Sequence, residues 1–152
     1  MREILFRGKR TDNGKFVEGF LFVRKDTKGE TIDHFIILDA YEQITFGQRY
    51  VRSNLNQECF RVQLETAGQF TGKTDKNGKK VFEHDILQIF TVWADGTKEK
   101  AGIGVVQWRE NDQCYVLTTK EGYHIDDFGN YGRPEYYEVI GNIHDNPELL
   151  EE

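Results

Sequence analysis

Short apolar runs separated by polar turns cover most of this chain, and they predict β-strands. Aromatic and β-branched residues fill the runs, and glycine-containing segments that suit tight turns lie between them. The pattern predicts a mostly β protein built from antiparallel hairpins, with minimal helix. The clearest runs are residues 4–7, 16–23, 86–93, 102–108 and 114–119.

Asn-Gly and Asp-Gly pairs mark the expected hairpins. Asn13-Gly14 separates the first two runs, Asn77-Gly78 repeats the pattern, and Asp95-Gly96 follows the third run. Because a type I′ turn needs a positive φ at both central residues, Asn-Gly between apolar runs predicts a hairpin of that type. Successive strands joined by such short turns form an antiparallel meander.

The second half of the chain contains strand candidates with apolar residues on both faces. In one of them, Ile103 and Val105 point one way while Val106 and Trp108 point the other. Two partly apolar faces favour a closed or partly closed barrel over a one-sided sheet. We therefore expect Trp108 in the core, whereas the sequence leaves the place of Trp93 open.

Turn residues concentrate in residues 68–80, where we place the boundary between two regions. Residues 1–70 are expected to form an N-terminal β region. Residues 71–152 are expected to form an SH3-like β-barrel domain, from the number and spacing of their strands. Residues 32–50 have no clear period and predict a strand plus a loop. Asn146, followed by proline, predicts the N-cap of a short terminal turn.

Composition and charge narrow the function. The chain of 152 residues has 20 Lys and Arg against 26 Asp and Glu, a formal net charge of −6 at pH 7. This balance argues against non-specific DNA binding, which requires clustered basic residues to neutralise phosphates. No apolar run approaches the roughly 20 residues of a membrane helix, and the first residues do not resemble a signal peptide. Cys59 and Cys114 predict free thiols in a reducing compartment, so we expect a cytoplasmic protein.

The negative charge is concentrated near the end of the sequence. Residues 121–152 contain Arg133 as their single basic residue against nine acidic residues. This acidic, tyrosine-rich stretch is suited to a basic partner, or it keeps the outside of an oligomer soluble.

Residues 68–86 carry a motif with three parts: an aromatic residue with Thr-Gly, then Asp-Lys-Asn-Gly, then Val-Phe-Glu-His-Asp-Ile. This arrangement resembles the signature of the YopX family of phage and prophage proteins. Residues 2–7 resemble the opening strand of that family, and residues 138–150 are similar to its closing motif. His84 stands where the family usually has glycine, so either the histidine adopts a left-handed conformation or the local turn differs from that of the family.

The resemblance implies a mostly β fold whose second part is like an SH3-type barrel. It also implies a homo-oligomer and a phage or prophage origin, which places the protein in the cytoplasm of a host cell. It implies no reaction, because the family has no assigned function and fold class alone does not supply one.

The physical interpretation of the motif is architectural. Asp75-Lys76-Asn77-Gly78 makes a hairpin, and the Asp85 carboxylate, directly before an apolar strand, accepts a backbone N–H from the turn. The alternative is a ligand site on a loop that the barrel holds rigid. The residues assigned to this structural motif are Thr71, Gly72, Asp75, Asn77, Gly78, Glu83, Asp85, Gly141 and Asn142.

Aromatic residues gather near residues 123–137, interleaved with glycines and acidic residues. Tyrosine with glycine is typical of contact surfaces, because its large amphipathic ring is ordered at a low entropic cost. The alternative is a long loop whose rings fill gaps on the barrel. The candidate contact surface comprises Tyr123, Phe128, Tyr131, Tyr136 and Tyr137.

Candidate chemistry is sparse, and we expect no catalytic residue, cofactor or metal. The histidines are far apart in sequence, and neither cysteine has zinc-ligand spacing. His124 lies near Asp126 and Asp127, a group that could bind a metal or act in general acid–base catalysis. A solvated acidic loop explains the same three residues.

Three functions compete. The first is a non-enzymatic accessory protein that self-associates and binds a phage or host protein. The alternative is a small β-barrel that binds nucleic acid through aromatic residues, although the net charge makes nucleic acid an unexpected partner. The third is a hydrolase or metalloenzyme that uses His124 and its neighbouring aspartates. Local support for the second comes from Lys73, Lys76, Lys79 and Lys80.

Overall fold

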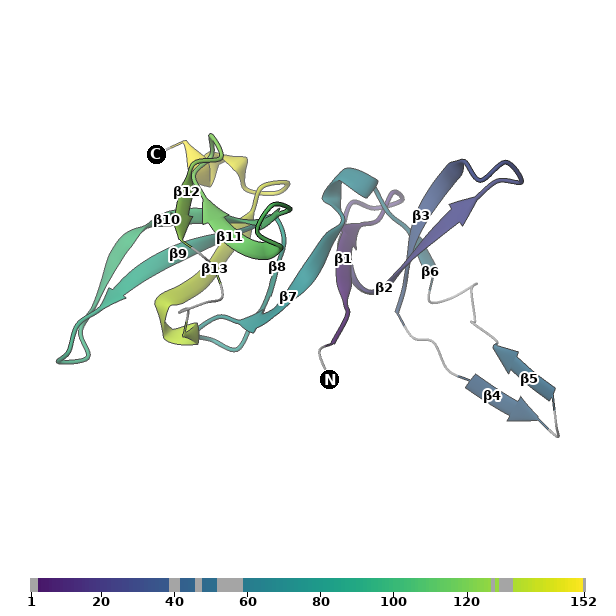
Figure 1. Cartoon of the computed structure of the whole chain (residues 1–152), viewed down its shortest axis with the longest axis horizontal. Helices are drawn as coiled ribbons and strands as arrows, with labels where there is room; N and C mark the ends of the chain where they lie inside the picture. Colours follow the sequence, from purple (N-terminus) through teal and green to yellow (C-terminus); the bar gives the residue numbers. More distant parts are fainter. Residues whose placement is uncertain are drawn as a thin grey trace. The chain divides into compact units, whose positions relative to one another are not determined.

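The structure is a computed structural model that describes residues 3–38, 42–45, 48–51, 59–126, 128 and 133–151. It divides into two compact units, Glu3–Gln69 and Phe70–Glu152 (Figure 1). Strands dominate both units, which confirms the mostly β prediction. In chain order the elements are β1 (Phe6–Lys9), β2 (Phe16–Lys25), β3 (Thr31–Ile37), β4 (Glu42–Thr45), β5 (Gln48–Val51), β6 (Cys59–Arg61), η1 (Leu64–Thr66), β7 (Gly68–Thr74), β8 (Lys80–Phe82), β9 (Asp85–Val92), β10 (Lys98–Arg109), β11 (Cys114–Thr118), β12 (His124–Asp126), η2 (Pro134–Tyr136), β13 (Tyr137–Asn142) and η3 (Pro147–Leu150).

The N-terminal unit contains antiparallel strands in the order β6-β3-β2-β1-β7. Gly68 and Gln69 of β7 pair with β1, and from Phe70 onward the same strand pairs with β8 of the C-terminal unit. The segment predicted as a strand plus a loop contains β3 and the β4–β5 hairpin. Residues 39–41 and 46–47 of that segment lie outside the described residues.

The hairpin turns differ from the predicted type I′ geometry. Gly14, Gly78 and Gly96 have φ values of +68°, +78° and +85°, but the Asn or Asp before each is not left-handed. In one turn the Gly78 N–H donates to the Asp75 carbonyl at 3.0 Å, and the Asp75 N–H donates to the Lys79 carbonyl at 2.8 Å. This is a type I turn followed by a bulge at a left-handed glycine. The type I′ prediction is wrong because this loop has three residues rather than two.

The C-terminal unit contains a five-stranded antiparallel sheet in the order β12-β11-β10-β9-β13. Strands β9 to β12 form the predicted meander, and β13 returns to pair with β9. Strands β12 and β13 are the edges, and within the described residues no sheet closes into a barrel. The predicted SH3-like barrel is not confirmed, because β8 pairs with β7 instead of bridging these two edges.

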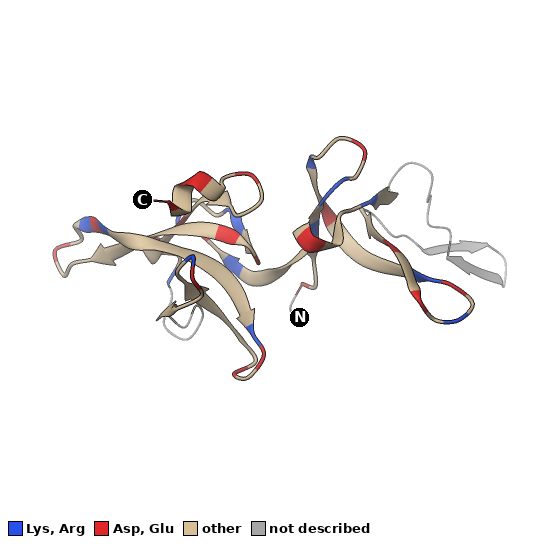
Figure 2. Ribbon diagram, turned by 90° about the horizontal axis from the view of Figure 1, so that it is seen from above, with Lys and Arg blue, Asp and Glu red and all other residues tan. Residues whose placement is uncertain are grey.

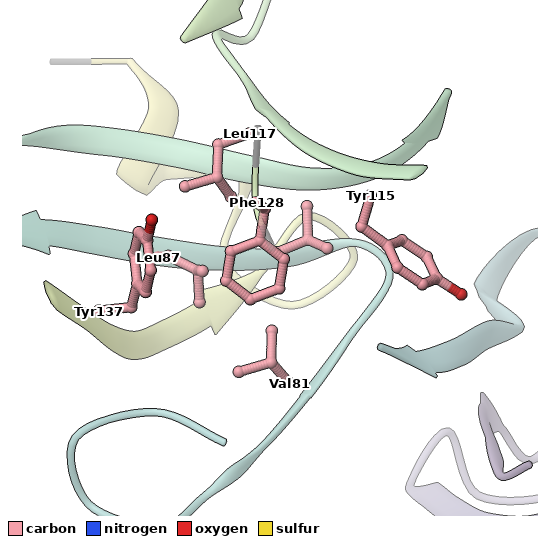
Figure 3. Packing of buried hydrophobic residues seen from close by; sticks show 7 residues of the cluster. Val81, Leu87, Tyr115, Leu117, Phe128 and Tyr137 are labelled. Carbon is pink, nitrogen blue, oxygen red and sulfur yellow. The ribbon is translucent and has the colours of Figure 1, made fainter. Parts of the chain in front are cut away.

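The hydrophobic core of this unit lies on one face of the five-stranded sheet (Figure 3). Leu87 and Leu117 come from β9 and β11 and have no exposed surface. Val81 of β8 and the ring of Phe128 pack over them, and Tyr137 of β13 meets Phe128 edge-on, with ring centroids 5.2 Å apart. These segments cover the apolar face of the sheet, which the opposite wall would cover in a closed barrel.

Trp108 does not lie in the core, contrary to the prediction. It lies on the face of β10 that carries buried Val106, but one residue before the strand ends, so 41% of its surface is exposed. Its ring packs edge-on against Tyr115 with centroids 5.0 Å apart, and its Nε1 donates to Glu110 at 2.8 Å. Trp93, which follows β9, is 54% exposed.

Helical structure in the described residues is limited to three short 3-10 helices, of which η3 matches the predicted terminal turn. The Asn146 side chain does not cap η3, because its Oδ1 accepts the Asn142 N–H at 3.4 Å instead. Acidic residues lie in η3 and in several turns of this unit (Figure 2). In the part of the chain that the structure describes, no helix is long and apolar enough to cross a membrane.

Candidate interaction surface

Asp75 is the centre of the predicted motif in the C-terminal unit. Its side chain is buried, and three backbone N–H groups point at it. Oδ1 accepts from Asn77 at 2.8 Å and from Lys79 at 2.9 Å, while Oδ2 accepts from Val139 of β13 at 3.0 Å. Both oxygens of the buried carboxylate are therefore hydrogen-bonded.

These contacts keep Asp75 ionised and hold the β7–β8 turn against β13. Burial raises the pKa of Asp75, but hydrogen bonds from Val139, Lys79 and Asn77 outweigh burial, so the pKa lies below its ordinary value. In the same turn the Lys76 N–H donates to the Tyr137 carbonyl at 3.0 Å. The turn thus protects an edge strand that would otherwise present unpaired backbone groups.

His84 and Asp85 shape the turn between β8 and β9. The Asp85 Oδ2 accepts the Phe82 N–H at 2.8 Å, the contact that the sequence predicts. His84 has a φ of +70°, so the histidine adopts the left-handed conformation. Its backbone N–H donates to the Val106 carbonyl at 2.9 Å, and its carbonyl accepts the Ile143 N–H at 3.0 Å.

The closing motif folds back onto His84. The His144 Nε2 lies 3.1 Å from the His84 Nδ1, although the two residues are 60 positions apart in the sequence. The Asn142 Oδ1 accepts the His144 N–H at 3.0 Å. Position 141 is crowded, because a Cβ there would lie 2.6 Å from the Asn146 Oδ1. The spacing of the histidines did not predict this pair.

The remaining motif residues lie in the same region. The Thr71 Oγ1 donates to the Val81 carbonyl at 2.9 Å, and Gly72 has a φ of +85° where the β7–β8 register shifts. Glu83 is half-buried in the turn before β9. The hydrogen bonds of the Thr71, Asp75 and Asp85 side chains run to backbone groups, so the motif joins β7, β8, β9 and β13.

The predicted tyrosine-rich surface is not one exposed patch. Phe128 and Tyr137 belong to the hydrophobic core, and half-buried Tyr136 packs against that core. Tyr123, in the turn before β12, is 72% exposed. Tyr131 lies outside the described residues. Of the four described aromatics, Phe128 and Tyr137 therefore fill the core, Tyr136 packs against it and Tyr123 faces solvent.

Of the histidine and two aspartates considered for chemistry, the structure describes the side chain of His124. His124 is exposed, the side chain of Asp126 is not described, and Asp127 lies outside the described residues. Where the structure describes the chain, no group of three or more His, Cys, Asp or Glu residues is arranged to hold a metal ion. Cys59 and Cys114 are free thiols, as predicted.

A surface that the sequence did not single out lies on the N-terminal sheet. Phe20 of β2 is directly opposite Ile37 of β3, and Phe22 is directly opposite Phe35. Residues two apart on a strand, and residues directly opposite in an antiparallel pair, share a face. These four apolar side chains therefore lie together, and we call them the phenylalanine face: Phe20, Phe22, Phe35 and Ile37.

The phenylalanine face is open, and its charged border is partly neutralised. Phe20 and Phe22 are 52% and 51% exposed. At the end of the face, buried Asp33 forms ion pairs with Arg24 and Arg61. The centre of the face is therefore uncharged, as in the core of a protein interface, with ion-paired residues at its rim.

Burial differs sharply between the two units. Among the described residues of the N-terminal unit, three hydrophobic side chains are buried and seven large ones are exposed. In the C-terminal unit the corresponding numbers are twelve and four. Of the seven exposed residues, Phe20 and Phe22 lie on the phenylalanine face, and contiguous exposed apolar residues mark an interaction site.

One sequence signal for this surface was present. Residues 16–23 carry apolar residues on both faces, and one face holds phenylalanine at positions 16, 20 and 22 together with Glu18. A one-sided sheet in water shows polar residues on its outer face. The apolar residues on both faces of this run therefore indicate a strand whose two faces are both covered. The run does not identify the strand that lies beside it.

The fold and its surface thus define a two-unit, all-β protein with an exposed apolar sheet face. The model of the YopX family, described as "YopX protein", matches residues 5–151. This chain belongs to the YopX family, as its motifs predicted.

A solved structure supports the same fold. The crystal structure of protein EF1440 from Enterococcus faecalis is similar to this chain, with 26% sequence identity and a TM-score of 0.54. The match covers 99% of each chain. No curated protein matches the chain.

Proposed function

We propose that this chain is a phage- or prophage-encoded accessory protein that acts inside the host cell as a non-enzymatic, self-associating protein-interaction module. The observation that carries the proposal is the phenylalanine face, exposed on a unit with few buried hydrophobic residues. Apolar side chains held open on a rigid sheet are stabilised when another protein covers them. The phage or prophage origin rests on the family resemblance.

Size-exclusion chromatography with light scattering tests self-association. We expect a mass above the 17.8 kDa of one chain, with a fraction of oligomer that grows with concentration across the micromolar range. A strict monomer over that range contradicts the proposal.

Binding of single-stranded nucleic acid is a second candidate function. Exposed rings on neighbouring strands can stack with bases, and Arg24 lies beside Phe35, 5.8 Å from the centroid of its ring. The ion pairs to Asp33 argue against nucleic-acid binding, because they occupy Arg24 and Arg61, the basic groups that would bind phosphates. One lysine of the predicted basic cluster is also engaged, since Lys76 pairs with Glu138 at 2.7 Å.

Gel-shift titration over salt separates the two candidates. Nucleic-acid binding predicts a shift at low salt that weakens steeply as salt rises, because bound phosphates release counterions. The protein-interaction proposal predicts no shift with single-stranded DNA, duplex DNA or RNA.

A further inference from the structure

The closing segment, residues 143–151, lies on the face of the five-stranded sheet that is opposite the hydrophobic core. Residues three apart on a strand point to opposite faces, and Val106 of β10 belongs to the core, so Ile103 is on the other face. Leu149 and Leu150 of η3 line a hollow together with Ile103. The closing segment therefore returns along the back of the sheet after β13 ends.

His84 joins the start of this segment to the turn between β8 and β9. Its carbonyl accepts the Ile143 N–H at 3.0 Å, and its Nδ1 lies 3.1 Å from the His144 Nε2. The two rings meet edge-on, with centroids 5.0 Å apart. At the other end of the segment, Glu151 pairs with Lys120 at 3.5 Å, but both side chains are exposed, and such a pair contributes little.

We propose that the His84–His144 pair is an acid-sensitive latch. At neutral pH the latch holds the closing segment on the sheet, and protonation of both imidazoles releases the segment. This inference goes beyond the proposed function, because it concerns a conformational change within one chain.

The chemistry of the pair makes the contact depend on protons. In a hydrogen bond between two imidazoles, one nitrogen donates and the other accepts. A neutral pair meets this condition, and a singly protonated pair meets it with a stronger, charge-assisted bond. A doubly protonated pair places two N–H donors and two positive charges 3.1 Å apart, so the bond is lost. The closed latch thus binds one proton where two separate histidines bind two, and acid favours the open state.

The charged groups around the pair stabilise its first proton. Glu83 and buried Asp85 flank His84 in the chain, and the Asp85 Oδ2 accepts the Phe82 N–H. Asp145 follows His144, and its Oδ2 accepts the Asn142 side-chain amide at 3.1 Å. The contacts from β10 and β13 are uncharged, because they come from the Val106 carbonyl and from Asn142. These carboxylates favour positive charge, but they cannot turn a second N–H donor into an acceptor.

Hydrogen–deuterium exchange of the Ile143 N–H measures the latch, because this group is bonded to the His84 carbonyl. The readout is the protection factor, the ratio of the intrinsic to the observed exchange rate, which removes the direct effect of pH on exchange. We compare about pH 7.5 with about pH 5, on either side of the ordinary histidine pKa of about 6.5. We expect the protection factor to fall about tenfold in acid, the size of one lost hydrogen bond with added repulsion.

Two variants remove the double charge and keep a polar side chain. His144→Gln presents an amide that can donate or accept, so it can bond to His84 in either protonation state. His84→Asn is the second variant, because asparagine tolerates the left-handed conformation of this position. We expect each variant to show the same protection factor at both pH values. The matched control is His124→Gln, an exposed histidine of the same unit, which should keep the wild-type fall.

Three results would overturn the latch. The first is an equal protection factor of the wild-type Ile143 N–H at both pH values. The second is a fall in His144→Gln or His84→Asn as large as in the wild type; circular dichroism checks that each variant is folded, and either one is sufficient. The third is an equal fall at the Lys76 N–H, which is bonded to the Tyr137 carbonyl, because acid would then unfold the unit as a whole.

Discussion

Replacing Asp75 with asparagine tests how the C-terminal unit is held together. The wild-type carboxylate accepts three backbone N–H groups, from Asn77, Lys79 and Val139. The asparagine amide keeps one oxygen for Asn77 and Lys79 but presents an NH2 group to the Val139 N–H. Two donors then face each other in a buried place, and one hydrogen bond is lost.

The size of the effect follows from these contacts. A buried N–H left without a partner costs about 1–3 kcal/mol, and a hydrogen bond to a charged group contributes roughly 1.5–3 kcal/mol. Because these terms overlap, we expect Asp75→Asn to lower the free energy of unfolding by about 2–4 kcal/mol at neutral pH. A loss of this size shifts the melting midpoint of a small domain by roughly 10 °C or more.

Urea unfolding followed by tryptophan fluorescence measures the loss. Both tryptophans of the chain, Trp93 and Trp108, lie in the C-terminal unit, so their signal reports on the unit that contains Asp75. Asp95→Asn is the matched control, because the Asp95 Oδ1 accepts the Thr97 N–H at 2.9 Å in a similar but exposed turn. Water replaces that contact, so little change is expected. Equal losses for the two variants would refute the reasoning.

The difference between wild type and Asp75→Asn also depends on pH. The pKa of Asp75 is lowered in the folded chain, so its stabilising effect is complete above the ordinary pKa of aspartate, about 4. The effect is lost as the pH falls through the lowered folded-state pKa. The two unfolding curves should therefore converge in acid, and a difference that stays constant to low pH contradicts this account.

Three further variants test the fold. His84→Gly should be about 1 kcal/mol more stable than His84→Ala, since both lose the ring and only glycine tolerates the φ of +70° without strain; equal urea midpoints would exclude that strain. Gly141→Ala should lower the free energy of unfolding by about 1 kcal/mol, because the new Cβ displaces the Asn146 side chain. An unchanged free energy of unfolding would mean that the closing turn rearranges without loss of stability. Leu117→Ala should cost about 2–5 kcal/mol in thermal unfolding, because Leu117 is fully buried, and a loss below that range would indicate a core that collapses around the gap.

Local chemistry explains what could be predicted about the fold. Gly78 needs a positive φ, and Asp75 accepts N–H groups from its own turn, so four consecutive residues are enough to predict this hairpin. The turn type was less predictable, because an Asn-Gly pair fits loops of two or three residues. The number of residues in the loop, set by strand pairing, decided between them.

Contacts between distant residues could not be predicted in this way. The Asp75 Oδ2 bonds to the Val139 N–H across 64 positions, and His84 meets His144 across 60. Barrel closure likewise depends on which strand pairs with β8. No periodicity in a single strand contains that information.

Sequence alone determined the strands, the turns, the two free thiols and the family to which this chain belongs, because each depends on residues close together or on a motif read in order. Tertiary structure decided which aromatic rings are buried. For Phe128 and Tyr137 the sequence left a contact surface and a gap-filling loop open, and both rings fill the core, while Phe20 and Phe22 remain half exposed. The physical reason is that apolar burial depends on what packs over a ring, and the covering residues come from segments far away in the chain.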